Sequence, residues 1–152
     1  MLKEYGYDHL PTYEEVKEGP QNLNLVNDHP LTLTTGTRIQ STFRSQHLNI
    51  PGLLKLQPHA EVLIHPTDAH PRNISTGDTV RVKTMRGEAE FTARVTDDIF
   101  EGVVDVNMGG GSPIQAEGWR ESNVNLLTDD QNRDPISGFP VLKALLCQVE
   151  KI

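Results

Sequence analysis

From residue 31 onward, the chain carries short stretches in which apolar and polar residues alternate. Successive side chains of a strand point to opposite faces, so this alternation is typical of half-buried β-strands. Two such stretches, 79–84 and 89–95, are separated only by residues 85–88 and therefore predict a β-hairpin. Its predicted inward-facing residues are Val80, Val82, Ala89, Phe91, Ala93 and Val95. Further strands are expected at 31–35, 61–65, 102–106 and 145–149.

Helical patterns are scarce between these strands. Residues 66–69 can open a short helix at its first-turn proline, which Pro71 then cuts short. Several short strands separated by turns favour a mainly β fold, a small barrel or a sandwich. Residues 1–30 differ from the rest, since they hold all three tyrosines among prolines and glutamates with few aliphatic residues. We therefore expect a lead-in arm over 1–30 that packs on another surface, and one domain over 31–152.

Composition excludes several classes of function. Lys and Arg number 14 against 21 Asp and Glu, a net charge of −7, which suits neither nucleic acid nor an anionic membrane. The single cysteine, Cys147, rules out an internal disulfide, a cysteine-rich zinc site and a self-contained iron–sulfur cluster, and we expect it to be an inert buried thiol. No apolar run is long enough for a membrane span. The chain is thus expected to be soluble, and cytoplasmic by default.

Neither a metal site nor a catalytic set is predicted from spacing. Among the six histidines, His59, His65 and His70 fit no metal-binding motif. The glycines at 109–111 lack the lysine that ends a phosphate-binding loop and precede no helix pattern, so they predict a flexible loop. No Ser/His/Asp set or carboxylate pair stands out.

Two polar stretches suit a ligand that carries phosphates or a polar heterocycle. At 33–38, a strand ends in a turn with threonine hydroxyls, a glycine and an arginine, and residues 43–47 add further donors. At 122–128, two asparagines two positions apart point the same way if the chain is extended, and their amides match the edges of pterin or guanine. The alternatives are a hydroxyl-lined strand with an exposed cation, and an asparagine-rich loop that caps its own backbone.

Six short motifs follow one another along the chain. They are Leu-Thr-Thr-Gly at 33–36, His-Pro-Thr-Asp-Ala at 65–69, the run ending in Gly-Asp-Thr-Val at 74–80, Arg-Gly at 86–87, Asn-Leu-Leu-Thr at 125–128, and Asp-Pro-Ile-Ser-Gly-Phe-Pro at 134–140 followed by Lys143. In this order they resemble the C-terminal molydopterin dinucleotide-binding domain of the bis-pterin molybdenum and tungsten oxidoreductases, the dimethyl sulfoxide reductase family. Residues 43–50, 121–123 and 146–149 most resemble the polysulfide and thiosulfate reductase branch.

Two departures from the family pattern concern the ligand contacts. Arg44 stands where the family commonly has histidine, and Ser112-Pro113 stands where that branch often has tryptophans. The contacts near the pterin and the substrate are therefore expected to differ in detail, while the fold is expected to be kept.

The resemblance implies a six-stranded double-psi β-barrel with a few short helices, which caps and orients molybdopterin guanine dinucleotide (bis-MGD) carrying molybdenum or tungsten. The parent enzyme would be an anaerobic oxidoreductase, formate dehydrogenase-like in class, and this chain would supply neither a catalytic residue nor a metal ligand. The residues that the resemblance implies for cofactor binding are Thr35, Gly36, Thr37, Arg38, Arg44, Ser45, His47, Asn123, Asn125 and Lys143.

The implied partners are the remainder of a catalytic subunit and an iron–sulfur electron-transfer subunit, and the chain alone is not expected to turn over substrate. Three alternatives stay open at this point. They are a separate small subunit of a formylmethanofuran dehydrogenase-like complex, a non-enzymatic double-psi adaptor domain such as certain ATPases carry, and a generic soluble β domain. The cofactor interpretation requires stretches 34–47 and 122–143 to converge on one concave face.

Overall fold

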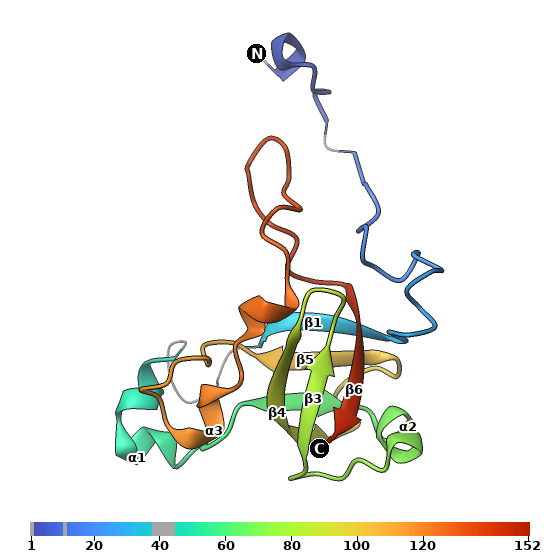
Figure 1. Ribbon diagram of the computed structural model, residues 1–152. Helices are drawn as coiled ribbons and strands as arrows, with labels where there is room; N and C mark the ends of the chain where they lie inside the picture. Colours follow the sequence, from blue (N-terminus) through green and yellow to red (C-terminus); the bar gives the residue numbers. More distant parts are fainter. Residues whose placement is uncertain (1, 11, 38–44) are drawn as a thin grey trace.

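The computed structural model of the chain describes residues 2–10, 12–37 and 45–152. Within these residues, six strands close into a barrel (Figure 1). The strands are β1 Leu31–Thr37, β2 Glu61–Ile64, β3 Thr79–Lys83, β4 Glu88–Val95, β5 Val103–Asn107 and β6 Leu145–Lys151. The helices are α1 Pro51–Leu54, α2 Pro66–Ala69 and α3 Glu117–Arg120, with 3₁₀ turns at Leu2–Tyr5, Gln46–Asn49, His70–Arg72 and Val124–Leu127. The predicted mainly β barrel with a few short helices is confirmed.

The strand order around the barrel is β1-β5-β2-β4-β3-β6. The pairs β1·β5 and β2·β4 are parallel, and the other four pairs are antiparallel. Exchanging β1, β2 and β3 for β4, β5 and β6 interchanges the two parallel pairs, interchanges β1·β6 with β3·β4, and leaves β2·β5 and β3·β6 as they are. The barrel therefore has the pseudo-two-fold pairing of a double-psi topology, although the sequence contains no visible repeat.

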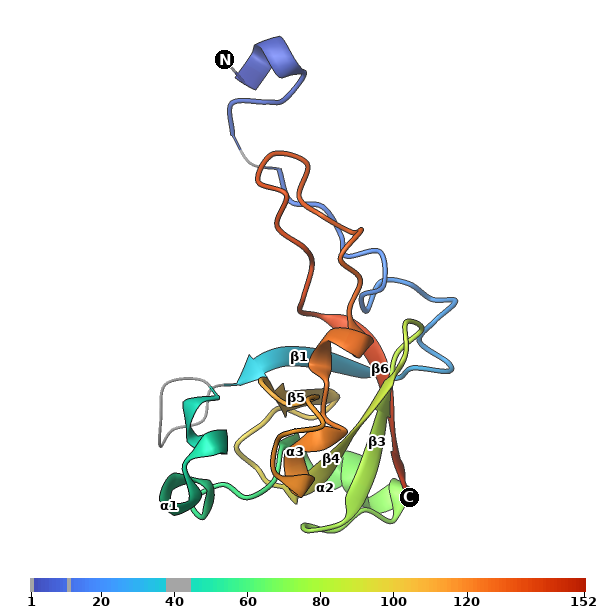
Figure 2. The same cartoon turned by 60° about the vertical axis from the view of Figure 1, so that its left-hand side comes forward.

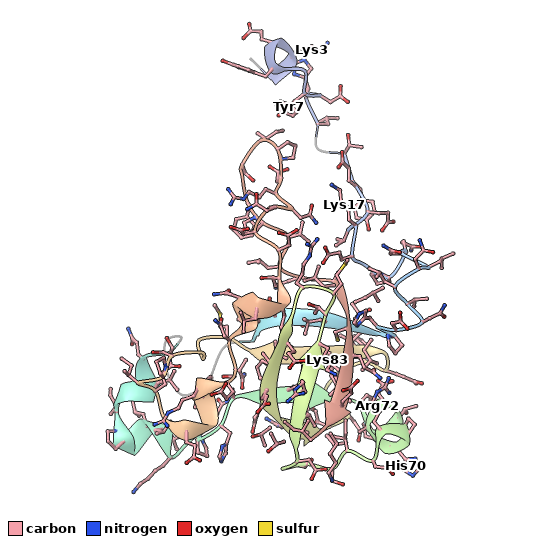
Figure 3. All side chains as sticks on the ribbon, viewed as in Figure 1. Lys3, Tyr7, Lys17, His70, Arg72 and Lys83 are labelled. Carbon is pink, nitrogen blue, oxygen red and sulfur yellow. The ribbon has the colours of Figure 1, made fainter. Side chains whose placement is uncertain are left out.

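The predicted hairpin is present and supplies much of the core. β3 and β4 pair antiparallel, with Val80 opposite Phe91 and Val82 opposite Ala89. These four side chains and Ala93 are buried, while Val95 is partly buried and packs against the same core. Each fully buried valine stabilises the fold by about 1.5–3 kcal/mol relative to an exposed one. On the outer side of β3, Lys83 Nζ donates to Glu150 Oε2 of β6 at 2.7 Å (Figure 3).

The short helix predicted at the proline after β2 is also present. Pro66 occupies its first turn, and His65 Nδ1 accepts a hydrogen bond from the Thr67 amide at 3.3 Å. Pro71 enters the following 3₁₀ turn, which ends at Asn73 with a left-handed φ of 54°. The chain therefore turns back toward β3 within a few residues.

Part of the lead-in arm packs on the barrel. The Leu146 amide of β6 donates to the Glu18 carbonyl oxygen at 2.7 Å, and the buried Glu18 carboxylate accepts a bond from Arg86 Nε at 2.7 Å. Arg86 lies in the β3–β4 turn, and its Nη2 also lies 3.0 Å from Asp129 Oδ2. One guanidinium thus joins the arm, the hairpin and the start of the loop that precedes β6.

Two segments leave the barrel on the same side, the arm ahead of residue 16 and the 129–142 loop (Figures 1 and 2). The Tyr7 hydroxyl of the arm (Figure 3) donates to the Pro135 carbonyl oxygen of the loop at 3.3 Å. Within the loop, the Asp134 amide donates to the Phe139 carbonyl oxygen at 2.8 Å. Most side chains of both segments are exposed, so these segments add little to the barrel core.

Candidate functional site

The carboxyl ends of the parallel strands β1 and β5 form the centre of the candidate site. Thr35 is in register with Val106 and Thr37 with Asn107, so Gly36 is an extra residue that bulges out of the strand. Gly36 has a φ of +97°, which an L side chain rarely adopts. Among the residues that the structure describes, a Cβ placed there would meet only Met108 Sδ, at 3.8 Å. The backbone at this bulge is therefore open to close approach by a ligand.

Thr35 connects this strand end to the segment before β6. Its side chain is buried, and its hydroxyl donates to the Leu142 carbonyl oxygen at 2.6 Å. The next residue, Lys143, is exposed, and Ala144 has a left-handed φ of 59°. The hydroxyl proton of Thr35 is thus used inside the fold. The same bond brings the 143 region, where a cofactor contact is predicted, to the end of β1.

Ser45 and Asn123 lie against opposite ends of the glycine loop 109–111. A Cβ on Gly109 would lie 2.8 Å from Ser45 Cβ, and one on Gly111 would lie 2.3 Å from Asn123 Cβ. Both distances are shorter than real Cβ contacts, so only glycine fits at these two points. Two predicted cofactor residues, 78 positions apart in the sequence, are therefore separated by a three-glycine loop.

The glycine loop is not the loose connection that the sequence predicted. The Gly111 amide donates to the Trp119 carbonyl oxygen at 2.8 Å, and Gln115 Nε2 donates to the Gly109 carbonyl oxygen at 2.8 Å. This correction has a simple cause, because three residues without Cβ let the 45 and 119–123 segments approach the loop closely. Composition indicates that glycine is flexible, but it does not indicate which neighbouring segments hold the loop in place.

The two asparagines do not extend as a strand. Asn123 is the N-cap of the 3₁₀ turn Val124–Leu127, and its Oδ1 accepts a bond from the Asn125 amide at 3.1 Å. The alternative of a loop that caps its own backbone is therefore observed. Asn125 is exposed, and Asn123 is partly exposed. The argument from parallel amides on a strand does not hold here.

Four other predicted residues are only partly placed. Thr37 ends β1, and His47 lies in the 3₁₀ turn Gln46–Asn49. Arg38 and Arg44 lie outside the described residues. Ser45 directly precedes the 3₁₀ turn that contains His47.

Sequence reasoning missed a buried amide at the end of β5. Asn107 is 3% exposed, and its Oδ1 accepts bonds from Gln57 Nε2 at 2.6 Å and from the Glu61 amide at 2.8 Å. The only sequence signal was an asparagine at the end of an apolar strand, where a β-branched residue is the usual choice.

Asp105 is a second residue that the sequence did not single out. It lies on β5 in register with Thr34 of β1 and Leu63 of β2. Burial raises the pKa of this carboxyl group, against the opposing effects of a hydrogen bond with Thr34 and of the positive charge of Lys143. Its Oδ1 is buried without a hydrogen-bond partner in the described part of the chain. A titratable group thus lies near one of the predicted cofactor residues.

These groups fit an anionic ligand that offers hydrogen-bonding edges. The open backbone at Gly36, the Ser45 hydroxyl, the Asn123 amide and the Lys143 ammonium are donors that suit phosphate oxygens and heterocycle carbonyls. Cys147, by contrast, is fully buried in the core, and burial raises the pKa of its thiol. It is the inert thiol that the sequence predicted.

Sequence comparison gives the class of protein to which this site belongs. The family model of the molydopterin dinucleotide binding domain matches residues 31–146. The chain therefore belongs to this family, as its motifs predicted.

The relatives are much longer proteins than this chain. The chain is 34% identical to the dopamine dehydroxylase of Eggerthella lenta over 99% of its own length and 16% of that protein. It is 34% identical to the dimethyl sulfoxide reductase DmsA of Escherichia coli over 95% of its length and 17% of that protein. The acetylene hydratase structure from Pelobacter acetylenicus superposes with a TM-score of 0.86 at 25% identity, over 99% of this chain and 22% of that one.

The chain thus spans between 16% and 22% of the length of these proteins. They do not support the predicted placement near the polysulfide and thiosulfate reductases, nor a specific likeness to formate dehydrogenases. The finer assignment rested on short stretches at 43–50, 121–123 and 146–149. One of these stretches forms part of the buried strand β6, so its residues serve the core. Separately, no helix in the described residues is long and apolar enough to cross a membrane.

Proposed function

We propose that this domain caps and orients molybdopterin guanine dinucleotide within the catalytic subunit of a molybdenum or tungsten oxidoreductase. The observation that carries the proposal is the convergence of two distant polar segments at the carboxyl ends of β1 and β5. Thr35 bonds to the residue before Lys143, and Ser45 and Asn123 flank one glycine loop. When bound, the cofactor and its metal supply the redox chemistry, and this chain supplies orientation and electrostatics.

The proposed roles follow from the chemistry of each group. The backbone beside Gly36 and the Ser45 hydroxyl donate to phosphate oxygens, and Lys143 adds a positive charge. The Nδ2 group of Asn123 donates to a carbonyl edge of the heterocycle. The complete proposed set is Thr35, Gly36, Thr37, Arg38, Arg44, Ser45, His47, Asn123, Asn125 and Lys143. None of these residues is proposed as a catalytic residue or a metal ligand.

The proposed partner is the remainder of the catalytic subunit, with an iron–sulfur electron-transfer subunit beyond it. The small share of each relative that the chain spans supports this. The arm and the 129–142 loop support it further, because they project together and carry large apolar side chains that are more than half exposed. These side chains are Tyr5, Leu10, Tyr13, Ile136 and Phe139. A surface of this kind usually marks a contact with another protein surface.

An immunoblot of the native host tests the partner proposal. An antibody against this domain should detect a polypeptide several times larger than the 16.9 kDa of this chain. A native band at 16.9 kDa would instead favour the separate small subunit of a formylmethanofuran dehydrogenase-like complex.

A cofactor-content measurement tests the binding proposal. The native protein that carries this domain is purified, and guanine nucleotide released by acid is counted per polypeptide before and after dialysis. Lys143→Met should lose the dinucleotide faster than wild type. Lys83→Met is the matched control, because Lys83 lies on the outer face of β3 and pairs with Glu150. Equal retention in wild type and both variants, or a wild type without guanine nucleotide, would contradict the proposal.

A further inference from the structure

A chain of partly buried polar contacts joins three elements around the candidate site. It starts at Asn107, whose Oδ1 accepts from Gln57 Nε2 at 2.6 Å. The backbone carbonyl oxygen of Gln57 then accepts from Trp119 Nε1 at 3.3 Å, and Trp119 is fully buried. The contacts therefore run from the end of β5, through the residues that follow α1, to α3.

Each of the linked elements leads directly to a proposed cofactor residue. The segment that ends at Gln57 begins at Ser45, and α3 is followed within three residues by Asn123. β5 is followed by the glycine loop that Ser45 and Asn123 flank. The Asn107–Gln57–Trp119 contacts thus fix the positions of the 45–57 and 119–125 segments. These three residues are not among the proposed cofactor contacts.

Gly110 sets the separation between the loop and one of these segments. A Cβ at this position would lie 1.9 Å from Ser122 Oγ and 2.6 Å from the Trp119 carbonyl oxygen. Unlike Gly109 and Gly111, Gly110 does not have a left-handed φ. Its glycine is therefore required by close packing alone, and an added methyl group would push the segment that carries Asn123 away from the loop.

We propose that Asn107, Gln57 and Gly110 are positioning residues that hold the 45–57 and 119–125 segments at the spacing required by the dinucleotide. The inference rests on the proposed function and extends it to residues that do not touch the ligand. The physical reason is that ligand groups must be held within a fraction of an ångström, and that buried amides fix such geometry when both partners are present. Loss of an outer contact of this kind typically weakens ligand retention by about tenfold or more.

Two variants of the native full-length protein test the proposal. Gln57→Leu removes the bond to Asn107 but keeps the backbone bond to Trp119. Gly110→Ala adds only the clashing methyl group. Gly52→Ala is the control, because a Cβ at Gly52 meets nothing within 4 Å and Gly52 lies in the same 45–57 segment. The readouts are the rate of guanine nucleotide loss on dialysis and the melting temperature of the cofactor-free protein.

The expected result is a roughly tenfold faster loss of nucleotide from Gln57→Leu and Gly110→Ala, measured well below their melting temperatures, with Gly52→Ala unchanged. Variants with lower melting temperatures but wild-type retention would show a merely structural role and overturn the inference.

The two proposals fail in different ways. If wild type holds the nucleotide and Lys143→Met loses it, while Gln57→Leu and Gly110→Ala retain it, only the positioning role is wrong. If Gly110→Ala does not fold, Gln57→Leu still decides the question. If Lys143→Met retains the nucleotide as wild type does, the proposed binding site itself is wrong.

Discussion

The barrel contains two parallel strand pairs, and their carboxyl ends differ although the topology relates them. At the end of β1 and β5, the chain bulges at Gly36 and continues into long connections. We call this the open end. At the closed end, the carboxyl ends of β4 and β2, the residues that follow the two strands contact each other directly. The Thr96 amide donates to the Ile64 carbonyl oxygen at 3.1 Å, and His65 Nε2 lies 3.6 Å from Asp97 Oδ1.

The proposed site therefore depends on features that the strand order alone does not supply. Both ends offer the divergent chain exits where ligands commonly bind in parallel sheets. Among the described residues, only the β1·β5 end has a bulge, a glycine loop and a buried amide that together set the spacing of separate segments. At the β2·β4 end, the polar groups bond to each other and cap helix α2, as His65 Nδ1 does by accepting from the Thr67 amide. Four measurements test how the two ends differ.

The first concerns the anchor of the open end. Trp119 is fully buried in α3, so Trp119→Ala should lower the free energy of unfolding by about 3–5 kcal/mol. Urea unfolding of the purified chain measures this loss. A loss below about 1 kcal/mol would mean that α3 packs loosely and cannot fix the site.

The second measurement compares two glycines with nearly equal positive φ angles. Gly36 has a φ of 97° and Gly77, before β3, a φ of 94°, and neither has a close neighbour for an added Cβ. Alanine at either position should cost about 1–2 kcal/mol, as judged by urea unfolding. Only Gly36→Ala should also weaken retention of guanine nucleotide by the native protein. If both variants retain the nucleotide equally, the bulge at Gly36 does not contribute to ligand binding.

The third concerns the buried carboxyl group of β5. Burial raises the pKa of Asp105, so the folded chain binds this proton more readily than the unfolded chain. The stability supplied by protonation is present in acid and is lost as pH rises through the ordinary aspartate pKa of 3.8 and above. Asp105→Asn should therefore raise the melting temperature by a few degrees at pH 7 and by less at pH 3. A gain that is larger in acid would contradict this sign.

The smallest effect is expected at the closed end. The Asp97 side chain is 88% exposed, so its ion pair with His65 is worth little. Asp97→Asn should change the free energy of unfolding by no more than about 0.5 kcal/mol and leave nucleotide retention unchanged. A measurable loss of nucleotide would mean that the closed end also contributes to binding.

The barrel was largely predictable because local patterns determine it. In the β3–β4 hairpin, alternation correctly places Val80 and Phe91 in the core. The end of β5 was less predictable. The sequence places it at Val106, because asparagine is a poor strand former, yet the strand includes Asn107. The bond from Gln57, fifty positions away, overrides that local preference.

The candidate site was predictable only as a set of segments. Motifs indicated the Thr35 and Lys143 regions, but the bond from Thr35 to Leu142 spans 107 positions and leaves no local signal. For Asn123, the capping alternative was visible in the sequence, and the structure selects it. Packing around the glycine loop could not be predicted, because it depends on which side chains arrive there from other elements.

The contact between Glu18 and Arg86 bears on how the barrel should be produced for crystallography or binding studies. A fragment trimmed to the family match would begin at residue 31. It would lack the carbonyl oxygen that accepts the Leu146 amide and the carboxylate that neutralises Arg86. It would also uncover the side of the core that Val16 covers. Recombinant fragments should therefore start ahead of Val16. A fragment that starts at residue 31 exposes apolar core side chains and the unpaired Leu146 amide beside β6, and we expect it to aggregate more readily.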